Sequence, residues 1–72
     1  MYKHYYVNKD TSSNPNHNHE VHTEDCTWMP SLANREYLGY FDNCTDAVQA
    51  AKGKKYSNVD GCKTCCPLCH KG

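Results

Sequence analysis

Aromatic and β-branched residues gather in a few short stretches of the chain, which predicts a small β-sheet. Residues 4–8 (HYYVN) combine aromatic and β-branched side chains and predict one strand. Residues 37–41 (YLGYF) predict a second strand, in which Gly39 marks a bulge or a close approach of the backbone. Residues 20–22 predict a shorter extended piece between them.

Two stretches lack this pattern and are predicted to be irregular. Residues 10–19 consist largely of turn-forming residues and predict a loop. Residues 27–36 surround Pro30, and here we expect Trp28 and Met29 to contribute to the core.

One helix is predicted, from Cys44 to about Lys52. Asn43 is a favourable N-cap, and Asp46 places a negative charge in the first turn, where it interacts well with the helix dipole. The apolar stripe at helical spacing is narrow and consists of Ala47, Val48 and Ala51. We expect Gly53 to end the helix, residues 54–60 to form a connector and Gly61 to permit a tight turn.

The size of the chain makes this core too thin to stabilise a fold alone. The chain has 72 residues, of which 38% are hydrophobic. We expect a single domain over residues 1–72, with residues 66–72 as a candidate short tail or terminal turn. A core of this size contributes only about 3–5 kcal/mol, so disulfides, a metal or a partner are usually required. The sequence therefore predicts a small α+β fold, a short sheet with one main helix packed around a metal site.

Two ligand pairs have the spacing of a zinc site. His22 and Cys26 form an H-x3-C pair, and Cys62 and Cys65 form a C-x2-C pair after Gly61. A structural zinc ion prefers four Cys or His ligands, usually supplied as two close pairs. The long gap between the pairs would let the metal tie both ends of the fold together.

The remaining cysteines leave the assignment open. Cys66 and Cys69 form a second C-x2-C pair, so they could replace Cys62 and Cys65 among the four metal ligands. Alternatively, a second metal site could use Cys44 and His70. Six cysteines also allow 15 disulfide connectivities, or a single disulfide such as Cys44 with Cys69 beside a zinc site. Cys44 at a helix N-terminus is a candidate reactive thiol, and Cys66 with Cys69 is a candidate dithiol couple.

Charge and hydropathy bear on partners and location. Residues 51–72 hold five Lys against one Asp, which makes phosphate groups of a nucleic acid, or another protein, candidate partners. There is no apolar run of membrane-spanning length and no hydrophobic stretch at the N-terminus, so we expect a cytoplasmic protein. In that reducing compartment, paired cysteines more often hold metal than form disulfides. We also expect a monomer. The nucleic-acid candidates are Lys52, Lys54, Lys55, Lys63 and Lys71.

A hydrolase centre built on the histidines is not favoured. His17, His19 and His22 are closely spaced, but no second cluster of acids and histidines follows to complete a catalytic site. We expect His17 and His19 to be loop residues, with Glu20 or His19 available to hydrogen-bond a metal ligand.

Taken in order, these features resemble the Ada-type metal-binding domain, the zinc module of bacterial Ada DNA-repair proteins. The resemblance covers Val21 to Cys65 and is carried by the two ligand pairs, Phe41-Asp42-Asn43 and the Ala-rich helix. It implies that His22, Cys26, Cys62 and Cys65 bind zinc. In the Ada protein the first cysteine of the C-x3-C pair accepts a methyl group from damaged DNA, and here that position is His22. The chain also looks similar to short bacterial proteins of unassigned function.

The sequence thus predicts a zinc-binding module with a structural or interaction role and no catalysis of its own. The alternatives are a nucleic-acid-binding module and a disulfide-stabilised or thiol-redox protein. Alkyl transfer is not expected, because an imidazole is not the thiolate nucleophile that this reaction needs.

Overall fold

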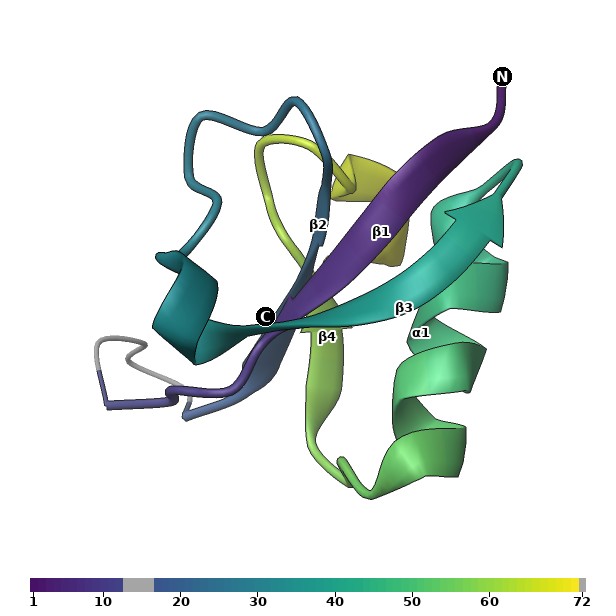
Figure 1. Ribbon diagram of the computed structural model, residues 1–72. Coiled ribbons are helices and arrows are strands. Elements are labelled where there is room, and N and C mark those ends of the chain that lie inside the picture. Colours follow the sequence, from purple (N-terminus) through teal and green to yellow (C-terminus); the bar gives the residue numbers. More distant parts are fainter. Residues whose placement is uncertain (13–16, 72) are drawn as a thin grey trace.

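Four short strands form one mixed sheet in the part of the chain that the structure, a computed structural model, describes: residues 1–12 and 17–71 (Figure 1). The strands are β1 (Lys3–Asn8), β2 (His19–Thr23), β3 (Arg35–Phe41) and β4 (Val59–Gly61). Their order is β3-β1-β2-β4, with β1 antiparallel to both neighbours and β4 parallel to β2. One α-helix, α1 (Cys44–Lys54), and two 3-10 turns, η1 (Leu32–Asn34) and η2 (Pro67–Cys69), complete the fold. The predicted small α+β fold is confirmed.

The core lies between the sheet and α1. Successive side chains of a strand point to opposite faces, so Tyr5 and Val7 of β1 turn to the same face. They are buried there with Val21 of β2 and Leu38 of β3. The other members of this core are Ala47, Ala51, Tyr56 and Cys66. The buried aliphatic side chains among the described residues are therefore gathered between the sheet and α1.

A bulge interrupts the β1–β3 ladder at Gly39, as the sequence predicts. The pairing shifts between Tyr5, which faces Gly39, and Tyr6, which faces Tyr37. Gly39 has a φ of +143°, a value that residues with a side chain rarely adopt. A Cβ there would also lie 2.8 Å from the ring of Phe41, so a side chain at this position would have to displace that ring.

The helix begins where the sequence predicts but ends later. The Asn43 side chain accepts a hydrogen bond from the backbone N–H of Asp46 at 2.9 Å, which is the expected N-cap. The prediction that Gly53 ends the helix is wrong, because α1 continues to Lys54. It stops where the N–H of Lys55 turns back to the carbonyl of Ala51, and Tyr56 then enters the core.

Strand β4 replaces the end of the predicted connector at residues 54–60. Val59–Gly61 contains one aliphatic residue and becomes a strand because it pairs with β2, Val21 facing Gly61. Gly61 therefore belongs to a strand and not to the predicted tight turn. A Cβ at Gly61 would lie 2.7 Å from the carbonyl oxygen of Cys66 and 2.7 Å from Cβ of Cys69, so glycine allows the C-terminal turn to lie against β4.

Two further expectations are corrected between residues 10 and 36. His19 belongs to β2, so the loop predicted at residues 10–19 is shorter, and its residues 13–16 lie outside the described part. Trp28 is 68% exposed and is not a core residue. The segment after β2 bends away from α1 (Figure 1), and the core is already filled from the helix side.

Candidate metal centre

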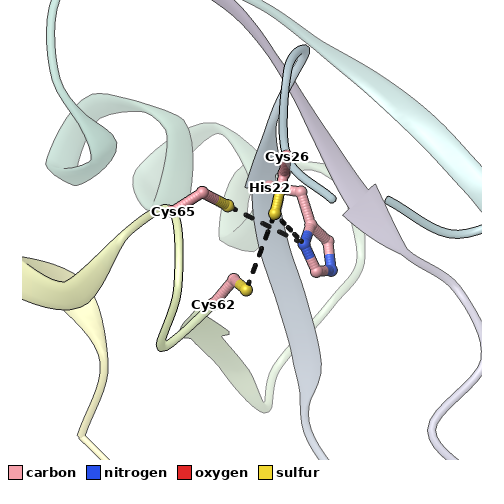
Figure 2. Close-up of side chains that lie close together, drawn as sticks. All are labelled: His22, Cys26, Cys62 and Cys65. Atoms are coloured by element: carbon pink, nitrogen blue, oxygen red, sulfur yellow. Dashed lines mark hydrogen bonds between the residues drawn. The ribbon is translucent and has the colours of Figure 1, made fainter. Parts of the chain in front are cut away.

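The four predicted ligands come together at one end of the sheet (Figure 2). His22 lies in β2 and Cys26 in the turn that follows it, whereas Cys62 and Cys65 follow β4. Because β2 and β4 are adjacent and parallel, the chain leaves both strands at the same end of the sheet. This pairing brings together two ligand pairs that are far apart in sequence.

The first pair is positioned by a short hydrogen-bonded turn. The Thr23 hydroxyl donates to Oδ1 of Asp25 at 2.7 Å, and the N–H of Cys26 donates to the carbonyl of Thr23 at 3.1 Å. The turn reverses the chain immediately after the strand. The thiol of Cys26 is thereby brought back to 3.5 Å from Nδ1 of His22.

The second pair is positioned by backbone contacts with β2. The N–H of Cys62 donates to the carbonyl of Val21 at 2.9 Å, and the N–H of Cys66 donates to the carbonyl of Cys62 at 2.8 Å. The N–H of Thr23 points at Sγ of Cys65 at 3.4 Å. Both thiols are therefore fixed against the strand that carries His22.

The distances between the ligand atoms fit a tetrahedral metal ion. Metal–sulfur bonds of about 2.3 Å and metal–nitrogen bonds of about 2.0 Å imply S–S edges of about 3.8 Å and S–N edges of about 3.5 Å. Sγ of Cys26 lies 3.9 Å from Sγ of Cys62, and Nδ1 of His22 lies 3.5 Å from Cys26 and 3.9 Å from Cys65. All four atoms lie within 4.8 Å of one another. The group could therefore hold a metal ion with little rearrangement.

The imidazole of His22 is oriented as metal-binding histidines usually are. Its Nδ1 faces the thiols, and its buried Nε2 has no hydrogen-bond partner in the described part of the chain. Oε1 of Glu20 lies 4.0 Å from Nε2, at the distance of a weak ion pair or a bridging water. A carboxylate beside the second ring nitrogen is the usual outer partner of a ligating histidine. His19 is directed elsewhere, with Nδ1 3.0 Å from the carbonyl of Asn8.

The thiols of the cluster differ in acidity. Hydrogen bonding from Cys66, followed by contacts from His22, Cys26 and the N–H of Thr23, lowers the pKa of Cys65 to about 3. Burial is the main cause that raises the pKa of Cys26 to about 12. Burial also raises the pKa of Cys62. A metal ion would thus displace protons from Cys26 and Cys62.

The alternative ligands are outside the cluster. Cys44 and Cys69 form a disulfide across 25 residues of sequence, one of the pairings that the sequence left open. Cys66 is a free thiol, 2% exposed, at the edge of the core. Nδ1 of His70 lies 3.2 Å from the carboxylate of Asp60 and 3.1 Å from the carbonyl of Gly61. The tetrad and second site that the sequence allowed from these residues are therefore not formed.

The five candidate lysines do not gather in one place. Lys54 pairs with Glu36 at 3.6 Å, and Lys55 lies over the ring of Tyr56. Lys52 and Lys71 line one cavity, and Lys63 lines another beside His22 and Cys62. This distribution gives no specific support to a phosphate-binding surface.

Comparison with family models, curated proteins and solved structures finds no match to this chain. Over residues 1–12 and 17–71, no helix combines the length and apolar character needed to cross a bilayer.

Proposed function

We propose that the chain is a small zinc-binding module in which the metal holds the fold together and no reaction is catalysed at the metal. The convergence of His22, Cys26, Cys62 and Cys65 from two parallel strands is the observation that carries this proposal. Zinc accepts tetrahedral nitrogen and sulfur ligands, and a site with four protein ligands leaves no position for a substrate. A bound zinc ion would cross-link the two ligand pairs.

The donor set supports zinc over harder cations. Three sulfur atoms and one imidazole nitrogen suit zinc, whereas calcium and magnesium prefer oxygen ligands. Three thiolates and a dication carry a formal charge of −1, and Lys63 lines the neighbouring cavity. The free energy of metal binding would then contribute directly to folding.

We further propose that the module is an Ada-type domain with histidine at the first ligand position. The order of elements supports this proposal: a strand, the His22–Cys26 turn, a strand, a helix and the Cys62–Cys65 turn. Methyl transfer in Ada uses a zinc-bound thiolate. With His22 at that position, we expect the chain to bind metal without accepting alkyl groups.

The test compares two cysteine variants in metal titrations. Cys62→Ser removes a proposed ligand, whereas Cys66→Ser removes a buried cysteine of the same loop that lies outside the proposed ligand set. We expect the wild type and Cys66→Ser to bind one zinc ion per chain, measured by native mass spectrometry, and Cys62→Ser to lose it. Cobalt substitution should give the strong sulfur-to-metal absorption of a site with three thiolates.

Chelation provides the second measurement. Circular dichroism should report loss of the fold when zinc is removed, since this core is too small to persist alone. A chain that stays folded without metal and with its three cluster thiols reduced would overturn the structural role. Equal metal binding by Cys62→Ser and Cys66→Ser would overturn the ligand assignment.

A further inference from the structure

The disulfide between Cys44 and Cys69 lies between two surface cavities. The first, which we call the lysine cavity, has a volume of about 220 Å³ and is formed by α1, β4 and the C-terminal turn. Its wall includes Cys69, Thr45, Lys52 and Lys71. The second has a volume of about 290 Å³ and is lined by Cys44, together with Cys65 and Cys66. The two cysteines of the disulfide thus line different cavities, and both are partly exposed.

We propose that this disulfide is a site of thiol–disulfide exchange for small anionic thiols of the glutathione class, which enter the lysine cavity and attack Sγ of Cys69. The inference goes beyond the proposed function, because neither cysteine belongs to the metal cluster. It concerns a stoichiometric modification of the protein, not turnover of a substrate.

The charge of the lysine cavity favours an anionic thiol. Two lysines, Lys52 and Lys71, line it, and both residues are exposed. Among the described residues of its wall, the one carboxylate is that of Asp60, which is buried and accepts the backbone N–H of Lys71 at 2.8 Å and lies 3.2 Å from Nδ1 of His70. An incoming carboxylate therefore meets a net positive wall, and such complementarity raises association rates.

The position of Cys44 makes it the favoured leaving group. Cys44 is the first residue of α1, where the unpaired backbone N–H groups and the helix dipole stabilise a negative charge. A thiol of lower pKa leaves faster in thiol–disulfide exchange. The Thr45 hydroxyl lies 3.9 Å from Sγ of Cys69, close to the sulfur that is attacked. The two ends of the disulfide are thus chemically different.

The exchange is balanced as a single displacement. The thiolate sulfur of the incoming molecule bonds to Sγ of Cys69, the S–S bond to Cys44 breaks, and Cys44 leaves as a thiolate. The product carries a mixed disulfide on Cys69 and a free Cys44. A second molecule of the same thiol then releases Cys69 as a thiolate and departs as its own disulfide.

The experiment uses the full zinc-loaded chain, reduced glutathione and the neutral thiol 2-mercaptoethanol at equal thiolate concentrations. Intact mass spectrometry measures the rates, and alkylation followed by peptide mapping locates the adduct. We expect glutathione on Cys69, alkylation of Cys44, and a rate for glutathione about three- to tenfold above that for the neutral thiol at low salt. A high salt concentration should remove this difference in rate, because it screens the attraction between glutathione and the lysines.

Matched lysine variants test the cavity. The double variant Lys52→Gln/Lys71→Gln should lose the preference for glutathione, whereas its exchange rate with 2-mercaptoethanol should be unchanged. Lys9→Gln with Lys55→Gln removes the same charge at exposed positions outside the cavity and should retain the preference. All four are surface residues, and circular dichroism would verify that each variant is folded.

Several results would overturn the proposal: no disulfide in the unreduced protein, glutathione attached to Cys44, or equal loss of preference in both lysine pairs. None of these results depends on which metal is bound. A chain that binds zinc as proposed but shows any of them would leave the metal site intact and remove the exchange site.

Discussion

Replacement of Gly61 by alanine tests how closely the C-terminal turn must lie against the sheet. The added Cβ would be 2.7 Å from the carbonyl oxygen of Cys66, 2.7 Å from Cβ of Cys69 and 3.0 Å from the carbonyl carbon of Cys69. Two of these three neighbours are backbone atoms. They cannot move aside by rotation of a side chain, so the turn itself must shift.

The expected cost follows from the size of this overlap. Overpacking of a tight site costs about 1–3 kcal/mol. We expect the upper half of that range for Gly61→Ala, because the disulfide to Cys44 restrains the turn. Gly53→Ala is the matched control, since nothing lies within 4 Å of its Cβ and the residue is inside α1. That variant should stabilise the protein by about 0.5–1 kcal/mol.

Thermal unfolding of the zinc-loaded, oxidised proteins, followed by circular dichroism, measures both effects. At about 4–8 °C per kcal/mol for a domain of this size, Gly61→Ala should lower Tm by about 10–20 °C. Gly53→Ala should raise it by about 2–8 °C under the same conversion. The opposite signs separate steric conflict from the general effect of adding a methyl group.

A double-mutant cycle covers the case in which Gly61→Ala does not fold at all. With Cys44→Ser and Cys69→Ser the turn is no longer tethered, so it can retreat and Gly61→Ala should cost less there. The reasoning would be refuted if Gly61→Ala were as harmless as Gly53→Ala. It would also be refuted if the cost were the same with and without the disulfide.

Three further predictions concern the disulfide, the helix cap and a partly buried acid–phenol contact. Cys44→Ser with Cys69→Ser should lower the free energy of unfolding by about 3.5 kcal/mol, the loop-closure value for 25 residues, measured by urea titration; a change below about 1 kcal/mol would contradict it. Asn43→Ala should cost about 1 kcal/mol in the same assay, because the N–H of Asp46 loses its acceptor; unchanged stability would contradict the cap. The Tyr56 hydroxyl donates to Glu36 at 2.6 Å and is the main cause that lowers the pKa of this carboxyl. A carboxyl whose pKa is lower in the folded state stabilises the protein above its unfolded-state pKa, and this stabilisation is lost as pH falls through its folded-state pKa. Tyr56→Phe should therefore raise the pKa of Glu36 in an NMR titration and weaken the dependence of stability on acid pH. An unchanged pKa of Glu36 would exclude the contact.

The sequence predicts the elements that depend on local chemistry. Asn43 and Asp46 define the start of the helix. The H-x3-C and C-x2-C spacings include the four residues that converge, although spacing alone does not choose between the two C-x2-C pairs. Gly39 predicts the bulge because a glycine inside a strand weakens it and usually marks a bulge or a close backbone approach. Each of these signals is complete within about five residues of chain.

The features that the sequence missed depend on distant neighbours. Val59–Gly61 has no strand pattern of its own and is a strand because β2 lies beside it. Trp28 has the composition of a core residue, yet it is 68% exposed because the core is filled from the α1 side. The Cys44–Cys69 pairing is one of many connectivities that the cysteine count allows, and only the packing of the C-terminal turn on α1 selects it.

The parallel pairing of β2 and β4 also has a kinetic consequence. Contacts across the metal cluster join residues 36 to 43 positions apart, such as Cys26 with Cys62 and His22 with Cys65. Chains dominated by such non-local contacts fold slowly, since loop closure must precede the contacts that reward it. A metal ion bound early by the local His22–Cys26 pair becomes fully coordinated only after a diffusive search of the chain brings Cys62 and Cys65 to it. Folding should therefore accelerate with free metal concentration only until this search becomes the slow step.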